Sequence, residues 1–173
     1  MPDGQSLIRL AQRHVGEQYI LGAKVPKNNP HWSGPWDCAE FTSWCTFQLT
    51  GKLFGCRPSS AGPDVADAYT GHWMDDARTL GRVITVGEAA ATPGAFLLRV
   101  PGAGINGHVV ISQGNGRTVE AHSTARGVVE AAVNDRRWSV GVLVPGITVG
   151  RRRPCSAAAS RARPSGDEAT DVW

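Results

Sequence analysis

Residues Trp36–Thr46, with the sequence WDCAEFTSWCT, predict a helix that begins at a cysteine. Asp37 suits the N-cap position and Glu40, three residues later, suits the closing position of a capping box, which places Cys38 at the first helical position. A thiol there faces the positive end of the helix dipole and unpaired backbone N–H groups, and both favour the thiolate. We therefore interpret Cys38 as a reactive cysteine and expect a histidine elsewhere to serve as its base.

The helix after this cysteine is predicted to bury one apolar face, because its apolar residues recur at helical spacing. Cys45 lies two turns beyond Cys38, too far for a disulfide, and is interpreted as a small core residue. The cysteines show no CxxC pair and no regular zinc spacing, so we expect free thiols and no metal. The apolar stripe consists of Phe41, Trp44, Cys45 and Leu49.

The composition is that of a globular protein with one domain. A length of 173 residues is enough to bury a sizeable core, and 41% hydrophobic and 19% charged residues are ordinary proportions. A formal net charge of +3 is too small to indicate nucleic-acid binding. No apolar run is long enough for a membrane span and no secretory signal is visible, so we expect neither, and we expect a monomer.

The order of the predicted elements indicates an α+β domain, because helical signals come first and β-type runs follow. An amphipathic helix is predicted over Ser6–His14 and a short helical stretch around Val65–Tyr69. We assign residues 1–148 to the domain and predict that the arginine-rich residues 149–173 form a disordered tail. The alternative for this tail is an electrostatic tether to an anionic surface. Strands are predicted at 83–86, 95–100, 108–112, 118–122, 127–133 and 139–144.

A loop over residues 17–36 brings aromatic side chains, including Tyr19 and Trp36, just ahead of the cysteine helix. Aromatic rings beside a nucleophile either fill the core or build the wall of a cleft, and the sequence leaves both interpretations open.

The segment GHVVISQGNGRTVEAHST, residues 107–124, predicts a β-hairpin with a turn at 114–116. If the apolar residues of both strands are buried on one side, His108 shares its face with Glu120 and His122. Because these three residues must share one face, only two pairing registers of the hairpin strands remain possible. A three-residue turn places His108 across from His122 with Glu120 diagonal to it, and a five-residue turn places His108 across from Glu120.

Either register gives the imidazole a polar partner, which is how a third group orients a catalytic base. We therefore predict a catalytic set of Cys38, His108 and Glu120, with His122 as the alternative third residue. The competing interpretation is the polar, solvent-facing side of an ordinary hairpin. A zinc site built from Cys38, His108 and His122 lacks the expected local ligand pairs.

Taken in chain order, these segments resemble the NlpC/P60 peptidases, which are papain-like cell-wall endopeptidases. The resemblance covers roughly residues 5–145. Glu40 follows Ala39 where the family usually has a Ser-Gly pair, Ala95 replaces a familiar aspartate, and Glu120 stands where many members have histidine. The matching segments are GEQYILGA around Tyr19, Asp37-Cys38-Ala39-Glu40, Pro93-Gly94-Ala95, His108–Ser112, and Glu120-Ala121 with Gly127-Val128.

The resemblance implies a papain-like α+β fold, with the cysteine helix packed on an antiparallel sheet. It implies hydrolysis of amide bonds in peptidoglycan stem peptides, with a γ-D-glutamyl bond as the expected site of cleavage and no cofactor. Tyr19 would line the substrate cleft, and we include the neighbouring Trp36 and Asp37 in the substrate-binding set. The alternatives are a CHAP-type amidase or endopeptidase and a catalytically inactive wall-binding module. A wall hydrolase without a visible signal is expected to be phage-associated, as a lysin, or exported by another route.

Overall fold

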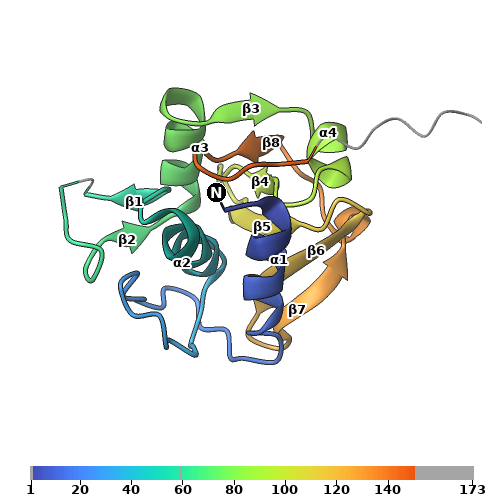
Figure 1. Cartoon of the computed structure of the whole chain (residues 1–173). Helices are drawn as coiled ribbons and strands as arrows, with labels where there is room; N and C mark the ends of the chain where they lie inside the picture. The colour runs from blue at the N-terminus through green and yellow to red at the C-terminus, as the bar shows by residue number, and fades with distance from the viewer. Residues whose placement is uncertain (1, 59, 151–173) are drawn as a thin grey trace, which may run out of the picture.

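Six antiparallel strands form the main sheet, in the order β3-β8-β4-β5-β6-β7 (Figure 1). The computed structural model describes residues 2–58 and 60–150. The strands are β3 (Arg82–Ile84), β4 (Phe96–Arg99), β5 (His108–Ser112), β6 (Arg117–Ser123), β7 (Gly127–Ala132) and β8 (Val140–Leu143), and a separate pair is formed by β1 (Cys56–Arg57) and β2 (Asp67–Ala68).

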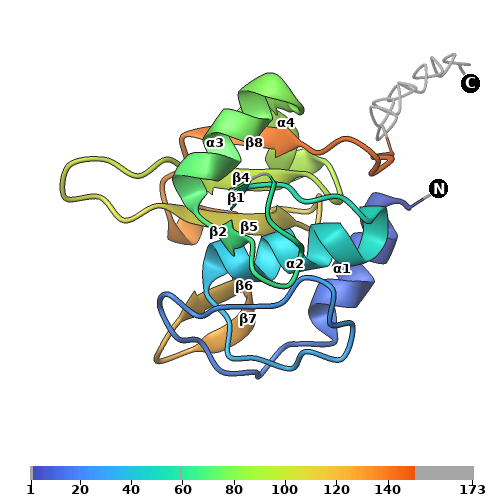
Figure 2. The same cartoon turned by 90° about the vertical axis from the view of Figure 1, so that its left-hand side faces the viewer.

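Helices cover both faces of this sheet. Helices α1 and α2 pack on the face formed by β5 and β6, whereas α4 packs on the opposite face of β4, β5 and β8 (Figure 2). Helix α3 lies against β3 and β4 at the side of the domain. The helices are α1 (Gly4–Gln12), α2 (Cys38–Thr50), α3 (Thr70–Thr79) and α4 (Val86–Ala91), with a 3₁₀ turn η1 at Val133–Asp135.

The predicted α+β class and the six predicted strands are confirmed, although strand ends differ slightly. The first helix begins at Gly4, earlier than predicted, because the side chain of Asp3 accepts a hydrogen bond from the Ser6 N–H. The helical stretch predicted around Val65–Tyr69 is wrong. That segment contains β2, which pairs with β1, and α3 begins only at Thr70.

Helix α2 is the central element of the fold, and its first nine residues are all buried. The predicted apolar stripe is buried, with Leu49 packed against the core, but burial extends beyond it to the polar residues of these first turns. Hydroxyl groups make this burial possible, because Thr42 donates to the Cys38 carbonyl at 2.9 Å and Ser43 donates to the Phe54 carbonyl at 2.7 Å. The helix ends at Gly51, whose φ of 67° is the left-handed conformation favoured at this position.

The predicted capping box at the start of α2 is formed only in part. Asp37 is the N-cap and accepts from the Glu40 N–H at 2.8 Å, as expected. The side chain of Glu40 does not return to the N-cap backbone. Its carboxylate instead forms a fully buried ion pair with Lys27 and accepts from the Ala68 N–H at 2.8 Å.

This ion pair ties the loop before α2 to the first turn of the helix. The ammonium group of Lys27 also donates to the carbonyls of Val25 and Ala66, so each of its three N–H bonds has an acceptor. A complete set of partners is the condition under which a buried ion pair is tolerated.

Replacing Lys27 with methionine should lower the free energy of unfolding by about 3–5 kcal/mol, because the Glu40 carboxyl group, whose pKa burial raises to about 7 even beside Lys27, would stay buried without its partner. Urea unfolding followed by circular dichroism measures this difference. The matched control is Lys24→Met, because Lys24 pairs with Asp67 at the surface and its side chain is 72% exposed. That change should cost less than about 1 kcal/mol. Equal losses of unfolding free energy in the two variants would contradict a stabilising role of the buried Lys27–Glu40 pair.

Residues 151–173 of the predicted tail lie outside the described residues. Within the described residues, no helix combines the length and the apolar character needed to cross a bilayer.

Candidate active site

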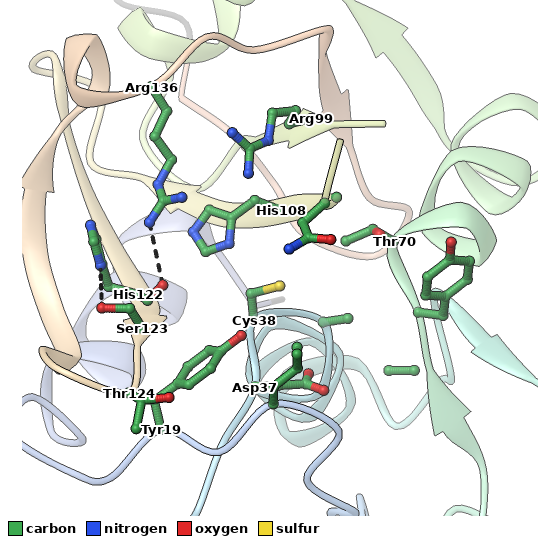
Figure 3. Close-up of a pocket in the computed structure, with 16 residues that line it drawn as sticks. Tyr19, Asp37, Cys38, Thr70, Arg99, His108, His122, Ser123, Thr124 and Arg136 are labelled. Atoms are coloured by element: carbon green, nitrogen blue, oxygen red, sulfur yellow. Dashed lines mark hydrogen bonds between the residues drawn. The ribbon is translucent and has the colours of Figure 1, made fainter. Parts of the chain in front are cut away.

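A cavity of about 380 Å³ lies between the start of α2 and the sheet, and it contains the predicted cysteine and histidine (Figure 3). Cys38 enters it from the first turn of α2, and His108 enters it from the first residue of β5. Its lining includes Tyr19, Asp37, Cys38, Arg99, His108, His122 and Arg136.

Cys38 is buried, with only 7% of its surface exposed, although it lies at the start of a helix. Burial, followed by the charge of Asp37, raises the pKa of the Cys38 thiol to about 12. Backbone hydrogen bonds from Val109 and Ala39 oppose this rise without cancelling it. The prediction that the helix start favours a thiolate is therefore wrong for this resting structure, because desolvation outweighs the helix dipole.

His108 is held by a carboxylate within the sheet. Its Nε2 lies 2.5 Å from Oε2 of Glu120, and Oε1 of Glu120 accepts a hydrogen bond from the Thr118 hydroxyl at 3.0 Å. Both members of the His108–Glu120 pair are buried. Because Nε2 is bound to Glu120, Nδ1 is the ring nitrogen that remains available to exchange a proton with a group in the cavity.

The strand register explains why Glu120 reaches His108. Strands β5 and β6 pair Ile111 with Val119 and Ser112 with Thr118, which is the register predicted for a three-residue turn. Glu120 then lies diagonal to His108, within reach of a long side chain. Gly114 adopts a φ of 76° in this turn, a conformation that glycine allows without steric cost.

Burial also sets the charge state of this pair. It lowers the pKa of His108 below 6.5, and the nearby Glu120 carboxylate only partly offsets that effect. Burial by itself would raise the pKa of Glu120, but the interactions with His108, the hydrogen bond from Thr118 and the charge of Arg136 together lower it. At neutral pH the cavity therefore holds a neutral thiol beside a neutral imidazole, with a carboxylate behind the ring.

His122, the alternative third residue, takes different partners. Its Nδ1 lies 2.9 Å from the Ser123 hydroxyl, and Nε2 accepts from Arg126 at 3.1 Å. The ring centroids of His122 and His108 are 6.4 Å apart. The geometry therefore brings Glu120 to the imidazole, while His122 lies at the edge of the cavity.

The predicted substrate-binding set is only partly brought to the cavity. Tyr19 lines it, and Figure 3 shows the ring directed toward Cys38. Burial, followed by repulsion from Cys38 once it is ionised and from Asp37, raises the pKa of the Tyr19 hydroxyl. Asp37 also lines the cavity, with Oδ2 accepting from the Gly22 N–H at 3.2 Å.

Trp36 does not reach the cavity. Its side chain is 0% exposed and packs edge-on against Phe41 and Trp44 in the core. Its indole N–H donates to the Glu17 carboxylate at 2.5 Å. Trp36 is therefore corrected to a core residue. Two rings outside the predicted set do lie at the site: Tyr69 lines the cavity, and Trp138 stacks on His108 with centroids 6.0 Å apart.

Sequence reasoning also missed two cationic residues of the cavity, Arg99 and Arg136. Arg99 lies directly across from His108 in the pairing of β4 and β5, a position that follows from the sheet order but not from local sequence. Arg136 follows η1, in a segment without regular spacing. Within the described residues, no group of three or more His, Cys, Asp or Glu side chains is arranged to hold a metal ion.

Several solved structures share this fold at low sequence identity. The NlpC/p60 domain of the peptidoglycan hydrolase SagA matches with a TM-score of 0.59 and 24% identity, covering 82% of this chain and 99% of that one. The P60 domain of antigen MAP1204 from M. avium subspecies paratuberculosis matches with a TM-score of 0.55 and 20% identity, over 82% and 93%.

The peptidoglycan hydrolase RipB from Mycobacterium tuberculosis matches with a TM-score of 0.50 and 21% identity, over 80% of this chain and 62% of that one. No family model matches the sequence, and no curated protein matches it.

Proposed function

Since this chain has the NlpC/P60 fold, we propose that it is a cysteine hydrolase that cleaves amide bonds in peptidoglycan stem peptides. One observation carries the proposal. The cavity holds Cys38 at a helix start beside His108, whose far nitrogen is bound by the buried carboxylate of Glu120. A nucleophile, a base and a group that orients the base are the minimum for nucleophilic amide hydrolysis.

The reaction begins with two neutral groups. His108 accepts the thiol proton of Cys38 as Sγ attacks the amide carbonyl, and Glu120 stabilises the resulting imidazolium. Backbone N–H groups at the start of α2, that of Cys38 among them, stabilise the oxyanion. The imidazolium then donates its proton to the leaving amine, which leaves an acyl thioester. Water attacks the thioester, His108 takes the water's proton, and Cys38 recovers its thiol.

The choice of substrate rests on the neighbours of known structure, two of which are described as peptidoglycan hydrolases. Within the stem peptide we propose a γ-D-glutamyl bond as the site of cleavage. Tyr19 and Asp37 form the wall of the cavity on the α2 side and are proposed to contact the acyl portion of the substrate.

The experiment that tests the proposal is digestion of purified sacculi. Incubation should release peptides with new amino termini, identified by mass spectrometry, and the Cys38→Ala protein should release almost none. Sacculi with different stem-peptide chemistry should be included. Failure to release peptides from every type of sacculus would contradict the hydrolase function.

The pH dependence of hydrolysis follows from the state of His108. Because burial holds its pKa below 6.5, the imidazole stays neutral and able to accept the thiol proton at mildly acidic pH. We therefore expect kcat/KM to fall on the acid side only below pH 6.5, as the ring becomes protonated. A pH profile on a soluble stem peptide measures this, and an acid limb centred above pH 6.5 would contradict the assignment.

A further inference from the structure

Two buried N–H groups on the sheet side of the cavity lack acceptors. Within residues 2–58 and 60–150, the Nε atoms of Arg99 and Arg136 are the buried side-chain nitrogen or oxygen atoms without a hydrogen-bond partner. An unsatisfied buried donor is costly, and more so when it carries charge. Because both residues line the same cavity as Cys38 and His108, a ligand that enters the cavity is placed to supply the missing acceptors.

The two guanidinium groups come from different elements and lie beside the same ring. Arg99, the last residue of β4, is paired with His108 across the sheet. Arg136 donates from Nη2 to the carbonyl of His122 at 3.3 Å. Figure 3 shows both side chains reaching toward His108 from the side opposite Cys38.

The nearby carboxylates do not fully neutralise the two guanidinium groups. Glu120 forms a long ion pair with Arg136, with Oε2 3.8 Å from Nε, but this is no hydrogen bond, because the oxygens of Glu120 accept from His108 and Thr118. Asp37 stands on the opposite wall, where its oxygens accept from backbone N–H groups. Among the described residues, Arg99 forms no salt bridge.

A carboxylate is the chemical group that fits these donors. Its two oxygens match the planar fork of a guanidinium, and an ionised acceptor strengthens each hydrogen bond. The chemistry of His108 determines which portion of the substrate the two arginines contact. The imidazolium must reach the nitrogen that leaves, so groups packed around His108 on the sheet side contact the portion of the substrate that carries this amine.

We propose that Arg99 and Arg136 form a subsite that binds a free carboxylate on the amine-side residue of the scissile bond. This inference rests on the proposed hydrolase function and specifies its substrate. The subsite would make the protein select stem peptides whose amine-side residue carries a free acid group and discriminate against the same peptides with that acid amidated.

Two synthetic stem peptides test this selectivity: one with diaminopimelate on the amine side of the γ-glutamyl bond, and one with its side-chain carboxyl converted to the amide. The wild-type protein should hydrolyse the acid with a kcat/KM about tenfold or more above that of the amide, the range given by one or two charged hydrogen bonds. Arg99→Met should lower this ratio by about tenfold, and Arg99→Lys should lower it less, because the charge is kept. Arg137→Met is the matched control, since Arg137 is exposed and outside the cavity lining, and it should keep the wild-type ratio.

Binding to the Cys38→Ala protein, measured by calorimetry, gives a readout that does not depend on hydrolysis. The acid peptide should bind about tenfold or more tightly than the amide, and Arg99→Met in the same background should remove the difference. Equal binding of the two peptides, or a ratio unaffected by Arg99→Met, would overturn the subsite while leaving hydrolysis intact. Selective binding without any hydrolysis by the wild type would instead support the subsite and refute the proposed function.

Discussion

Replacing Cys38 with alanine should reduce the rate of peptide release from sacculi by on the order of 10³-fold or more. The thiol is the nucleophile of the proposed reaction, and no neighbouring group in the cavity replaces it. His108 and Glu120 would remain in place, but they would have no thiol to activate. The rate is measured from released amino groups, with mass spectrometry to identify the fragments.

The matched control is Cys45→Ala, which removes a thiol from the same helix two turns away. Cys45 is fully buried in the main core and is not part of the cavity lining. Its replacement should lower stability while leaving the rate of the folded protein within a few-fold of wild type. Equal rates for the Cys38→Ala protein and the wild type would refute the cysteine mechanism.

The sequence was sufficient for the elements whose pattern is local. Alternating apolar residues and glycine turns located the strands, and Asp37 located the start of α2. Strand parity limited the partner of His108 to two residues. The pairing of Ile111 with Val119 is the register of a three-residue turn, in which Glu120 is only diagonal to His108, yet the carboxylate of Glu120 reaches the imidazole while His122 binds other partners.

The features that the sequence did not reveal arise from tertiary packing. Glu40 has the spacing of a capping residue, yet the buried ammonium of Lys27 competes successfully for its carboxylate. The helix dipole predicts a thiolate at Cys38, yet the sheet packed over the helix desolvates the thiol and raises its pKa. Arg99 meets His108 only because β4 is the neighbour of β5. Each of these effects depends on residues distant in the chain.

Replacing Glu120 with glutamine should reduce kcat/KM by about 10²-fold or more, because a neutral amide no longer stabilises the imidazolium that forms as the thiol is deprotonated. Glutamine keeps the size of the side chain and retains an oxygen able to accept from Nε2. The loss therefore reports the charge of residue 120 rather than its volume. The matched control is His122→Gln, which should change the rate only a few-fold, since His122 binds Ser123 and Arg126.

The pH profile distinguishes an electrostatic role of Glu120 from a merely structural one. The hydrogen bond and charge of Glu120 raise the pKa of His108, opposing burial, so their removal should lower that pKa further. The acid limb of kcat/KM in Glu120→Gln should therefore move to lower pH than in the wild type, even as the plateau falls. A variant that only misplaced the imidazole would lower the plateau and leave the limb where it was. If the acid limb moves in His122→Gln but not in Glu120→Gln, His122 rather than Glu120 is the residue that stabilises the His108 imidazolium.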